Sequence, residues 1–251
     1  MRHLAVPFVT ALVGVLACPT VLALDMVMLW PAQDNTLYES ASGALSSGAG
    51  PTMFVGRTAQ PSGSIRRGVL AFDVASAIPA GSIVTDVQLT LHSDQFANVQ
   101  DETISLHRVL SAWGEGSSLP PGAGGGGAPA SAGDATWLHT FFPGQFWASP
   151  GGDFAAGASA ATLVGGAGYY VWQSPGLIAD VQAWVDNPAA DFGWLLLGNE
   201  SAASTAKRFA SREDLEPTFR PLLHVEYVPE PATGMLAVAA VAVLGGVRRP
   251  R

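Results

Sequence analysis

Aromatic side chains crowd into residues 136–147, and of all the residues in this sequence they are the best suited to bind a ligand. They surround a turn at Pro143 and Gly144, and they are Trp137, His139, Phe141, Phe142, Phe146 and Trp147. The apolar C–H faces of a sugar stack on aromatic rings, and nearby polar groups can bind its hydroxyls. We therefore predict a ligand-binding platform formed by Trp137, His139, Phe142 and Trp147.

A second aromatic group, Tyr169, Tyr170 and Trp172, lies in a segment with strand character. Side chains alternate between the two faces of a strand, so Tyr170 and Trp172 share one face and Tyr169 points the other way. We add Tyr169 to the predicted ligand-binding set, because only part of this group can face solvent. The alternative for both groups is that the rings fill the core or cover a long loop.

The residue spacing of a catalytic centre is missing from this sequence. No Gly-x-Ser-x-Gly motif occurs, and no serine has an obvious histidine and aspartate companion. Glu213 and Asp214 could serve a glycosidase only if a second acid lay roughly 5–10 Å away across a sugar. We favour a turn before Pro217 as the explanation of these two acids. We predict a non-catalytic protein that uses no cofactor.

Metal binding is the other chemistry that the sequence could support. No histidine stands at metal-ligand spacing with another histidine, a cysteine or an acid, which argues against zinc. Asp34, Asp73 and Asp153 stand at the ends of expected elements, where many sandwich modules bind calcium. No loop has an EF-hand pattern, however, and turn formation accounts for each aspartate. We therefore predict no metal site.

The composition favours one all-β domain with an acidic surface. The 251 residues include 29 glycines and 18 prolines, with β-branched and aromatic clusters between them. The formal net charge of −8 argues against nucleic acid and anionic lipid headgroups as partners. Without the two terminal segments discussed below, about 200 residues remain, enough for one domain with a closed core.

Alternating apolar residues predict an antiparallel β-sandwich of the jelly-roll kind. The alternation is clearest in residues 83–92, where Val87, Leu89 and Leu91 point to one face and the polar residues between them to the other. We expect a turn at residues 31–35 and a loop at residues 40–51. Further strands are expected at residues 26–30, 36–39, 52–57, 65–74, 103–110, 161–172, 193–198, 206–212 and 221–227.

One short helix is expected after the strand at residues 161–172. Ser174 can cap it, Pro175 suits its first position, and Asn187 followed by proline ends it. Trp184 falls on its packed side, three residues after Val181. The buried side is predicted to be Ile178, Val181 and Val185, and the core is predicted to hold Trp113, Trp184 and Trp194.

Residues 117–133 contain two adjacent prolines and a run of glycines at residues 124–127. Such a segment cannot bury enough apolar surface to order itself. We expect a mobile surface loop within one domain, because neither side of it looks complete alone.

The N-terminus has the features of a signal peptide spanning residues 1–23. A weakly basic start is followed by an apolar stretch at residues 4–17, and small or aliphatic residues precede an expected cleavage after Ala23. The single cysteine, Cys18, would leave with this peptide, so the mature chain would have no disulfide. The alternative is a lipoprotein signal that ends at Cys18, which fits poorly because Pro19 would follow the lipidated residue.

Residues 229–251 look like a sorting tail. An apolar run at residues 235–247 is shorter than the roughly 20 residues that a spanning helix needs. It lies between the motif Pro229, Glu230, Pro231 and the basic pair Arg248, Arg249. This arrangement resembles the PEP-CTERM signal of Gram-negative bacteria, which an exosortase is thought to recognise and remove. The alternative is an ordinary C-terminal membrane anchor.

The domain between these segments, residues 24–228, resembles the DNRLRE family. Residues 34–39 match its signature at four of six letters, and they depart from it at Thr36 and Tyr38, where the signature has arginines. This departure puts any charge-based role of the segment in doubt. Further landmarks that resemble the family follow in order: residues 66–67 with 70–73, 78–81, 113–116, 135–137, 151–154, 180–184 and 209–213.

The resemblance implies a jelly-roll module of the carbohydrate-binding kind, found on secreted and surface proteins. With the export signals, it implies a non-catalytic protein secreted to the outside or the cell surface of a Gram-negative bacterium. The expected partners are an extracellular polysaccharide, and signal peptidase and an exosortase during export, with only transient membrane contact through the tail. An anionic glycan would need a basic cleft or a divalent cation. The alternative is a structural matrix or surface protein without a specific glycan ligand.

Overall fold

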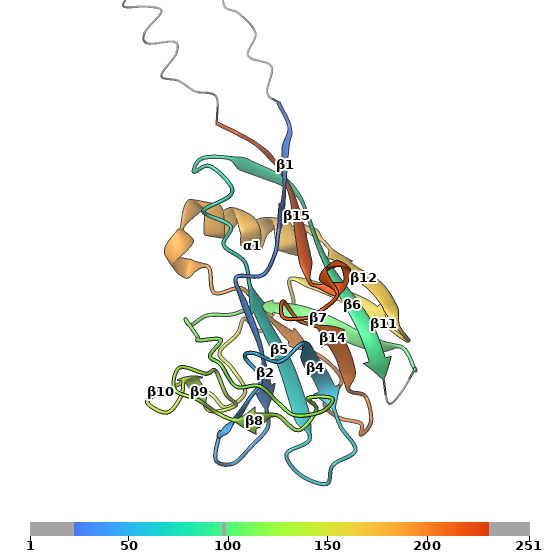
Figure 1. Ribbon diagram of the computed structural model, residues 1–251. Helices are drawn as coiled ribbons and strands as arrows, with labels where there is room; N and C mark the ends of the chain where they lie inside the picture. Colours follow the sequence, from blue (N-terminus) through green and yellow to red (C-terminus); the bar gives the residue numbers. More distant parts are fainter. Residues whose placement is uncertain (1–22, 97–98, 231–251) are drawn as a thin grey trace, which may run out of the picture. The chain divides into compact units, whose positions relative to one another are not determined.

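Antiparallel strands joined by glycine- and proline-rich turns build a β-sandwich with one short helix, which confirms the predicted fold class (Figure 1). The computed structural model describes residues 23–96 and 99–230, and their compact unit is Leu24–Glu230. The strands are β1 (Asp25–Leu29), β2 (Gln33–Tyr38), β3 (Leu45–Ser46), β4 (Thr52–Arg57), β5 (Ile65–Ala71), β6 (Ile83–Phe96), β7 (Glu102–Arg108), β8 (Ala128–Pro129), β9 (His139–Phe141), β10 (Gln145–Phe146), β11 (Ala160–Val164), β12 (Gly168–Gln173), β13 (Trp194–Leu197), β14 (Lys207–Ala210) and β15 (Leu222–Val228). The helical elements are α1 (Pro175–Asp186) and the 3-10 turns η1 (Pro188–Ala190) and η2 (Pro217–Phe219).

The strands form two layers that share β4. The first layer has the order β1–β15–β6–β14–β4, and β12 pairs with β6 as well. The second layer has the order β2–β5–β13–β7–β11. Thr52 to Val55 pair with β14, whereas Gly56 and Arg57 pair with β5, so β4 crosses from one layer to the other at Gly56.

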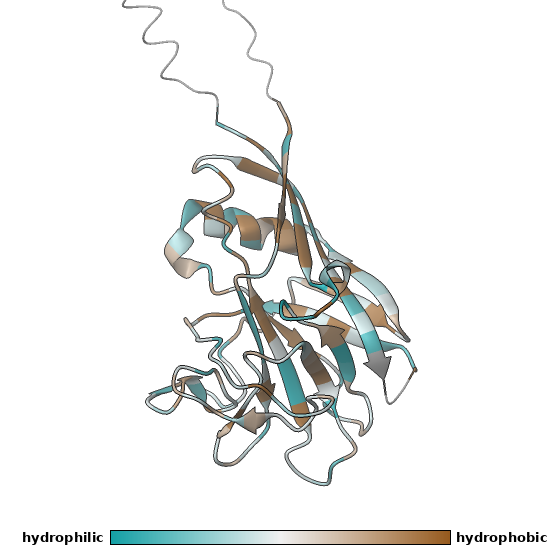
Figure 2. Ribbon diagram, viewed as in Figure 1, coloured by the Kyte–Doolittle hydropathy of each residue, from teal (hydrophilic) through white to brown (hydrophobic). Residues whose placement is uncertain are grey.

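The main core lies between the two layers. Val87, Leu89 and Leu91 are fully buried, and the polar residues between them point outward, as the alternation in β6 predicted. Figure 2 shows hydrophobic and hydrophilic residues alternating along the strands around this core. Trp184 and Trp194 are fully buried in it, and their ring centroids lie 4.5 Å apart. The predicted placement of these two tryptophans in the core is confirmed.

Helix α1 begins and ends where the sequence predicts. The Ser174 side chain accepts hydrogen bonds from the backbone N–H groups of Gly176 and Leu177, and Pro175 takes the first helical position. The predicted residues Val181 and Val185 are buried, whereas Ile178 is only partly buried at the edge of the core. The other buried residues of the helix are Leu177, Asp180 and Trp184.

A second apolar cluster lies on the other side of the second layer. Val69 and Ala71 of β5 point into it, while Leu70 between them belongs to the main core. Trp113 and Trp147 come from the long segment between β7 and β11 and pack on this cluster. This segment therefore covers the outer face of the second layer, so both faces of β5 are buried.

Residues 117–133 differ from the mobile loop that the composition predicts. β8 pairs with β3, and the carboxylate of Asp134 accepts hydrogen bonds from the backbone N–H groups of Ser117 and Ser131, at 2.8 Å each, and from the Ser118 hydroxyl. The Tyr38 hydroxyl donates to the Gly124 carbonyl at 2.8 Å. The composition predicted a mobile loop because it shows little apolar surface to bury, whereas the segment is held by buried polar contacts.

Two expected strand boundaries are wrong. The expected turn at residues 31–35 belongs largely to β2, since Asp34 and Asn35 are buried and pair with Leu70 and Val69 of β5. The single strand expected at residues 161–172 is two strands, β11 and β12. They pair with β7 and β6, in different layers, and glycines at residues 165 and 166 stand at the break.

The two export signals fall mostly outside the described residues. Residues 1–22 of the expected signal peptide are not described, nor are Pro231, Arg248 and Arg249 of the sorting motif. Pro229 is half-buried and Glu230 is exposed after the end of β15. In the described part of the chain, no helix is both long enough and apolar enough to span a membrane.

Candidate functional site

The two tryptophans of the predicted platform belong to the cover of the second layer. Trp147 is only 5% exposed, and its indole N–H donates to the Thr136 carbonyl at 2.9 Å. Trp137 is half-buried beneath the Arg67 guanidinium, which lies 4.9 Å from its ring centroid. Trp147 therefore presents no ring face to a ligand. This agrees with the alternative interpretation, in which the rings fill the core or cover a long loop.

The other predicted platform residues lie around the β9–β10 hairpin. His139 is buried, and its Nδ1 lies 2.9 Å from the Thr136 hydroxyl. Its ring contacts Phe142 and Phe146 at centroid distances of 5.0 and 4.4 Å. Phe146 is 62% exposed and is the most open ring of the hairpin. The hairpin thus offers one exposed ring and not the broad platform that we expected.

The structure places Tyr169 in a different ring cluster, on β12. Its centroid lies 4.7 Å from that of His92 on β6 and 6.3 Å from that of Phe219 in η2. His92 and Phe219 stack face to face at 3.9 Å. The Tyr169 hydroxyl donates to the Thr218 carbonyl at 3.1 Å, which fixes the ring while leaving it 54% exposed. Tyr169 is a rigid exposed ring on the outside of the first layer.

Tyr169 belongs to a continuous surface that we name the outer sheet face. Residues that are paired across antiparallel strands point to the same side of a sheet. The register of β12, β6, β15 and β1 therefore brings one set of outward side chains together. They are Tyr169, Val171 and Gln173 on β12, Asp86, Gln88, Thr90 and His92 on β6, His224 and Glu226 on β15, and Met26 and Met28 on β1.

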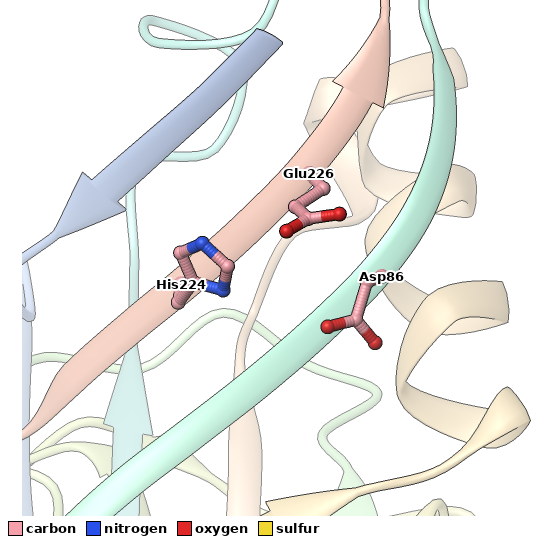
Figure 3. Close-up of side chains that lie close together, drawn as sticks. All are labelled: Asp86, His224 and Glu226. Atoms are coloured by element: carbon pink, nitrogen blue, oxygen red, sulfur yellow. The ribbon is translucent and has the colours of Figure 1, made fainter. Parts of the chain in front are cut away.

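Asp86, His224 and Glu226 form the polar centre of this face (Figure 3). His224 and Glu226 stand two residues apart on β15, and Asp86 is paired with Glu226 across the strands. One ligand atom from each lies within 4.8 Å of the others. The strand register shifts between Glu226 and Tyr227, and such bulges re-aim side chains beside functional sites.

Asp86 is held as an ionised acceptor. Its two carboxylate oxygens accept hydrogen bonds from the side-chain amides of Gln173 at 2.8 Å and Gln88 at 2.9 Å. Burial works against the charged form, but these hydrogen bonds outweigh it and lower the pKa of Asp86. A carboxylate fixed between two amides, beside an imidazole and a second carboxylate, can bind vicinal hydroxyl groups.

This trio was not predicted. We expected no histidine at metal-ligand spacing, but the alternation of β15 puts His224 and Glu226 on one face, which the sequence could have indicated. Asp86 could not be found without the strand register. A nitrogen and two carboxylate oxygens at this separation could also hold a metal ion, although two amide donors already occupy Asp86.

None of the known protein-family models matches this chain, and no curated protein matches it. A function is therefore inferred from the side chains of the outer sheet face and the β9–β10 hairpin.

Proposed function

We propose that this protein is a non-catalytic module that binds an extracellular polysaccharide through the outer sheet face. The observation that carries the proposal is the fixed, exposed ring of Tyr169 on the same face as Asp86, His224 and Glu226. One unit of an extended polysaccharide could stack on the tyrosine while the hydroxyls of a unit further along the chain bind the polar trio, which lies four to six residues away along β6.

The charge and shape of this face favour a neutral polysaccharide. Asp86 and Glu226 make this face negative, and the chain as a whole has a formal net charge of −8, so an anionic glycan is disfavoured. An open sheet face also suits an extended polymer better than a small ligand, which needs a pocket to bury most of its surface. Amides, carboxylates and an exposed ring together supply what a chain of neutral sugars requires.

Export completes the proposal. The apolar N-terminus, residues 1–23, would act as a signal peptide, and residues 229–251 as a sorting tail of the PEP-CTERM kind, removed by an exosortase. The domain would be a member of the DNRLRE family. Mass spectrometry of the protein released from its host tests the export route, since a mature chain that retains residues 1–23 or 235–251 contradicts it.

Binding of residues 24–230 to a panel of neutral and anionic glycans tests the function. We expect Tyr169→Ala to weaken binding by about 5- to 150-fold, because a stacked ring contributes roughly 1–3 kcal/mol. Asp86→Asn should weaken binding to a similar degree, and Phe146→Ala on the hairpin is the matched control. Loss of binding in Phe146→Ala alone would move the site to the hairpin and refute our assignment. Trp147→Ala is unsuitable, because the ring is buried.

A structural role is the second candidate, and the edge strand β1 favours it. Within the described residues β1 pairs only with β15, and it carries the exposed side chains of Met26 and Met28. An open edge with apolar side chains can pair with another copy of the chain. Concentration-dependent assembly in analytical ultracentrifugation, with no glycan bound from the panel, would favour this role over polysaccharide binding.

A further inference from the structure

Three acidic side chains that are distant in sequence meet beside β2. Asp34 belongs to β2, Glu115 to the segment that covers the second layer, and Glu213 to the turn after β14. One carboxylate oxygen of each lies within 4.8 Å of the others. Asp34 is 1% exposed, whereas Glu115 and Glu213 are half-buried. The three carboxylates join three separate parts of the chain.

Arg212 is the basic residue of this cluster. Its guanidinium bonds a Glu115 oxygen at 2.8 Å and a Glu213 oxygen at 3.1 Å, and its backbone N–H donates to Asp34 Oδ2 at 2.7 Å. The Asp34 N–H donates to the other Glu115 oxygen at 2.9 Å. With all three acids ionised and one guanidinium beside them, the cluster has a net charge of about −2 and lacks two positive charges. The ion pairs of Arg212 with Glu115 and Glu213 also distinguish these acids from a glycosidase pair, whose carboxyl groups flank a sugar.

The second observation is an orphaned oxygen. Asp34 Oδ1 is buried, and none of the described residues gives it a hydrogen bond. Buried carboxylate oxygens without a partner are costly and rare in folded proteins, so this atom requires a proton or a cation. The groups around it are further carboxylates and one arginine, and only the arginine is positively charged.

The raised pKa values of this cluster agree with the need of Asp34 for a proton or a cation. Burial, followed by repulsion from Glu213, raises the pKa of Asp34 well above its ordinary value. Burial, followed by repulsion from Glu115, raises the pKa of Glu213 to about 7. Without another positive charge, the cluster resists full ionisation near neutral pH.

We propose that Asp34, Glu115 and Glu213 form a binding site for a divalent cation, with calcium as the ion that suits them best. The donors are all carboxylate oxygens, which hard cations prefer, and no sulfur or nitrogen ligand takes part. Two positive charges balance the cluster, and Asp34 Oδ1 gains its missing partner. Bound calcium would clamp β2, the covering segment and the end of β14 together.

Calcium titration of residues 24–230, after treatment with a chelator, tests this site. We expect heat of binding in calorimetry and a rise of several degrees in the unfolding temperature at about 1 mM calcium, the range typical of extracellular modules. Magnesium at the same concentration should act less, because its octahedral shell is harder to satisfy here. If wild-type protein shows neither heat nor a shift with calcium, the site is refuted.

Two variants locate the ion. Asp34→Asn keeps the size of the side chain but removes its charge, and it should abolish the calcium response. Asp25→Asn removes an exposed carboxylate from β1, outside both acidic groups, and is the control that should leave the response intact. A calcium response kept in Asp34→Asn would overturn the assignment, and its loss in Asp86→Asn would place the ion on the outer sheet face instead. If Asp34→Asn does not fold, Glu213→Gln replaces it, with the same expected loss.

Discussion

Asn35 shows how much one buried side chain can organise. Its side-chain N–H groups donate to the Ser46 hydroxyl at 2.9 Å and to the Glu115 carbonyl at 2.8 Å. Its side-chain oxygen accepts from the backbone N–H groups of Thr36 and Ser47, at 2.7 and 2.9 Å. A single amide thus satisfies backbone groups from three separate segments, and few residue types could replace it.

Asn35→Ala should therefore destabilise the domain strongly. It leaves two buried N–H groups and one buried carbonyl without their partner, so we expect the free energy of unfolding to fall by about 2–4 kcal/mol. Urea unfolding followed by tryptophan fluorescence measures this change. Gln88→Ala, on the outer sheet face, is the control and should change stability by about 0.5 kcal/mol or less. A loss below about 1 kcal/mol for Asn35→Ala would show that water replaces the amide.

Glu213 should make stability depend on pH. Its pKa is raised from 4.5 to about 7, so between these values the folded state binds more protons than the unfolded state. Stability without metal must then fall as the pH rises through this window. We expect a higher urea midpoint at about pH 5.5 than at about pH 7.5 in chelator, and a flatter profile for Glu213→Gln. A wild-type profile as flat as that of the variant would contradict this account.

At the scale of elements, a strand is easier to predict when only one of its faces is buried, because apolar and polar residues then alternate along it. β6 and β15 have one buried face, so alternation identified both. β5 has two buried faces, and its run of buried residues does not show that the segment between β7 and β11 covers the second face. This is why Trp147 seemed available for binding. Tyr169 was placed correctly on the outside of its strand because β12 alternates.

The cover of the second layer depends on Asp134. Asp134→Ala removes the acceptor for the Ser117 and Ser131 N–H groups and for the Ser118 hydroxyl, so residues 117–133 should lose their attachment. We expect a loss of about 2–4 kcal/mol and new proteolytic cuts within this glycine-rich segment. Limited proteolysis with mass spectrometry shows where the chain is cut. Asp134→Asn keeps one acceptor oxygen, so its stability should lie between those of the wild type and Asp134→Ala. An unchanged cutting pattern in Asp134→Ala would contradict the role of Asp134 in holding residues 117–133.

At the scale of the whole molecule, the two layers are joined where β4 changes partner. Gly56 at this crossing has a φ of 112°, and a Cβ there would lie 3.0 Å from the Thr205 carbonyl oxygen. Only glycine adopts this backbone without strain. The sequence could place a strand at residues 52–57, but not its change of sheet, because the change depends on pairings with β14 and β5 that are distant in sequence.

Gly56→Ala should destabilise the crossing of β4 from one layer to the other. The strained backbone and the close carbonyl contact predict a loss of about 1–3 kcal/mol in the free energy of unfolding. Calorimetric unfolding temperatures of the variant and the wild type measure it. Gly166→Ala is the matched control, since a Cβ there meets nothing within 4 Å. Equal unfolding temperatures for the two variants would mean that the crossing tolerates a side chain.

The pairing of Asp25 with Tyr227 has a mechanical consequence. The folded unit begins and ends on adjacent strands, so Leu24 and Glu230 emerge at one pole of it. If the protein is held from the Glu230 end while a polymer pulls on the outer sheet face, the force runs lengthwise along β15. The hydrogen bonds between β15 and β6 would then be sheared together and would not open one by one, which is the stronger way to load a sheet.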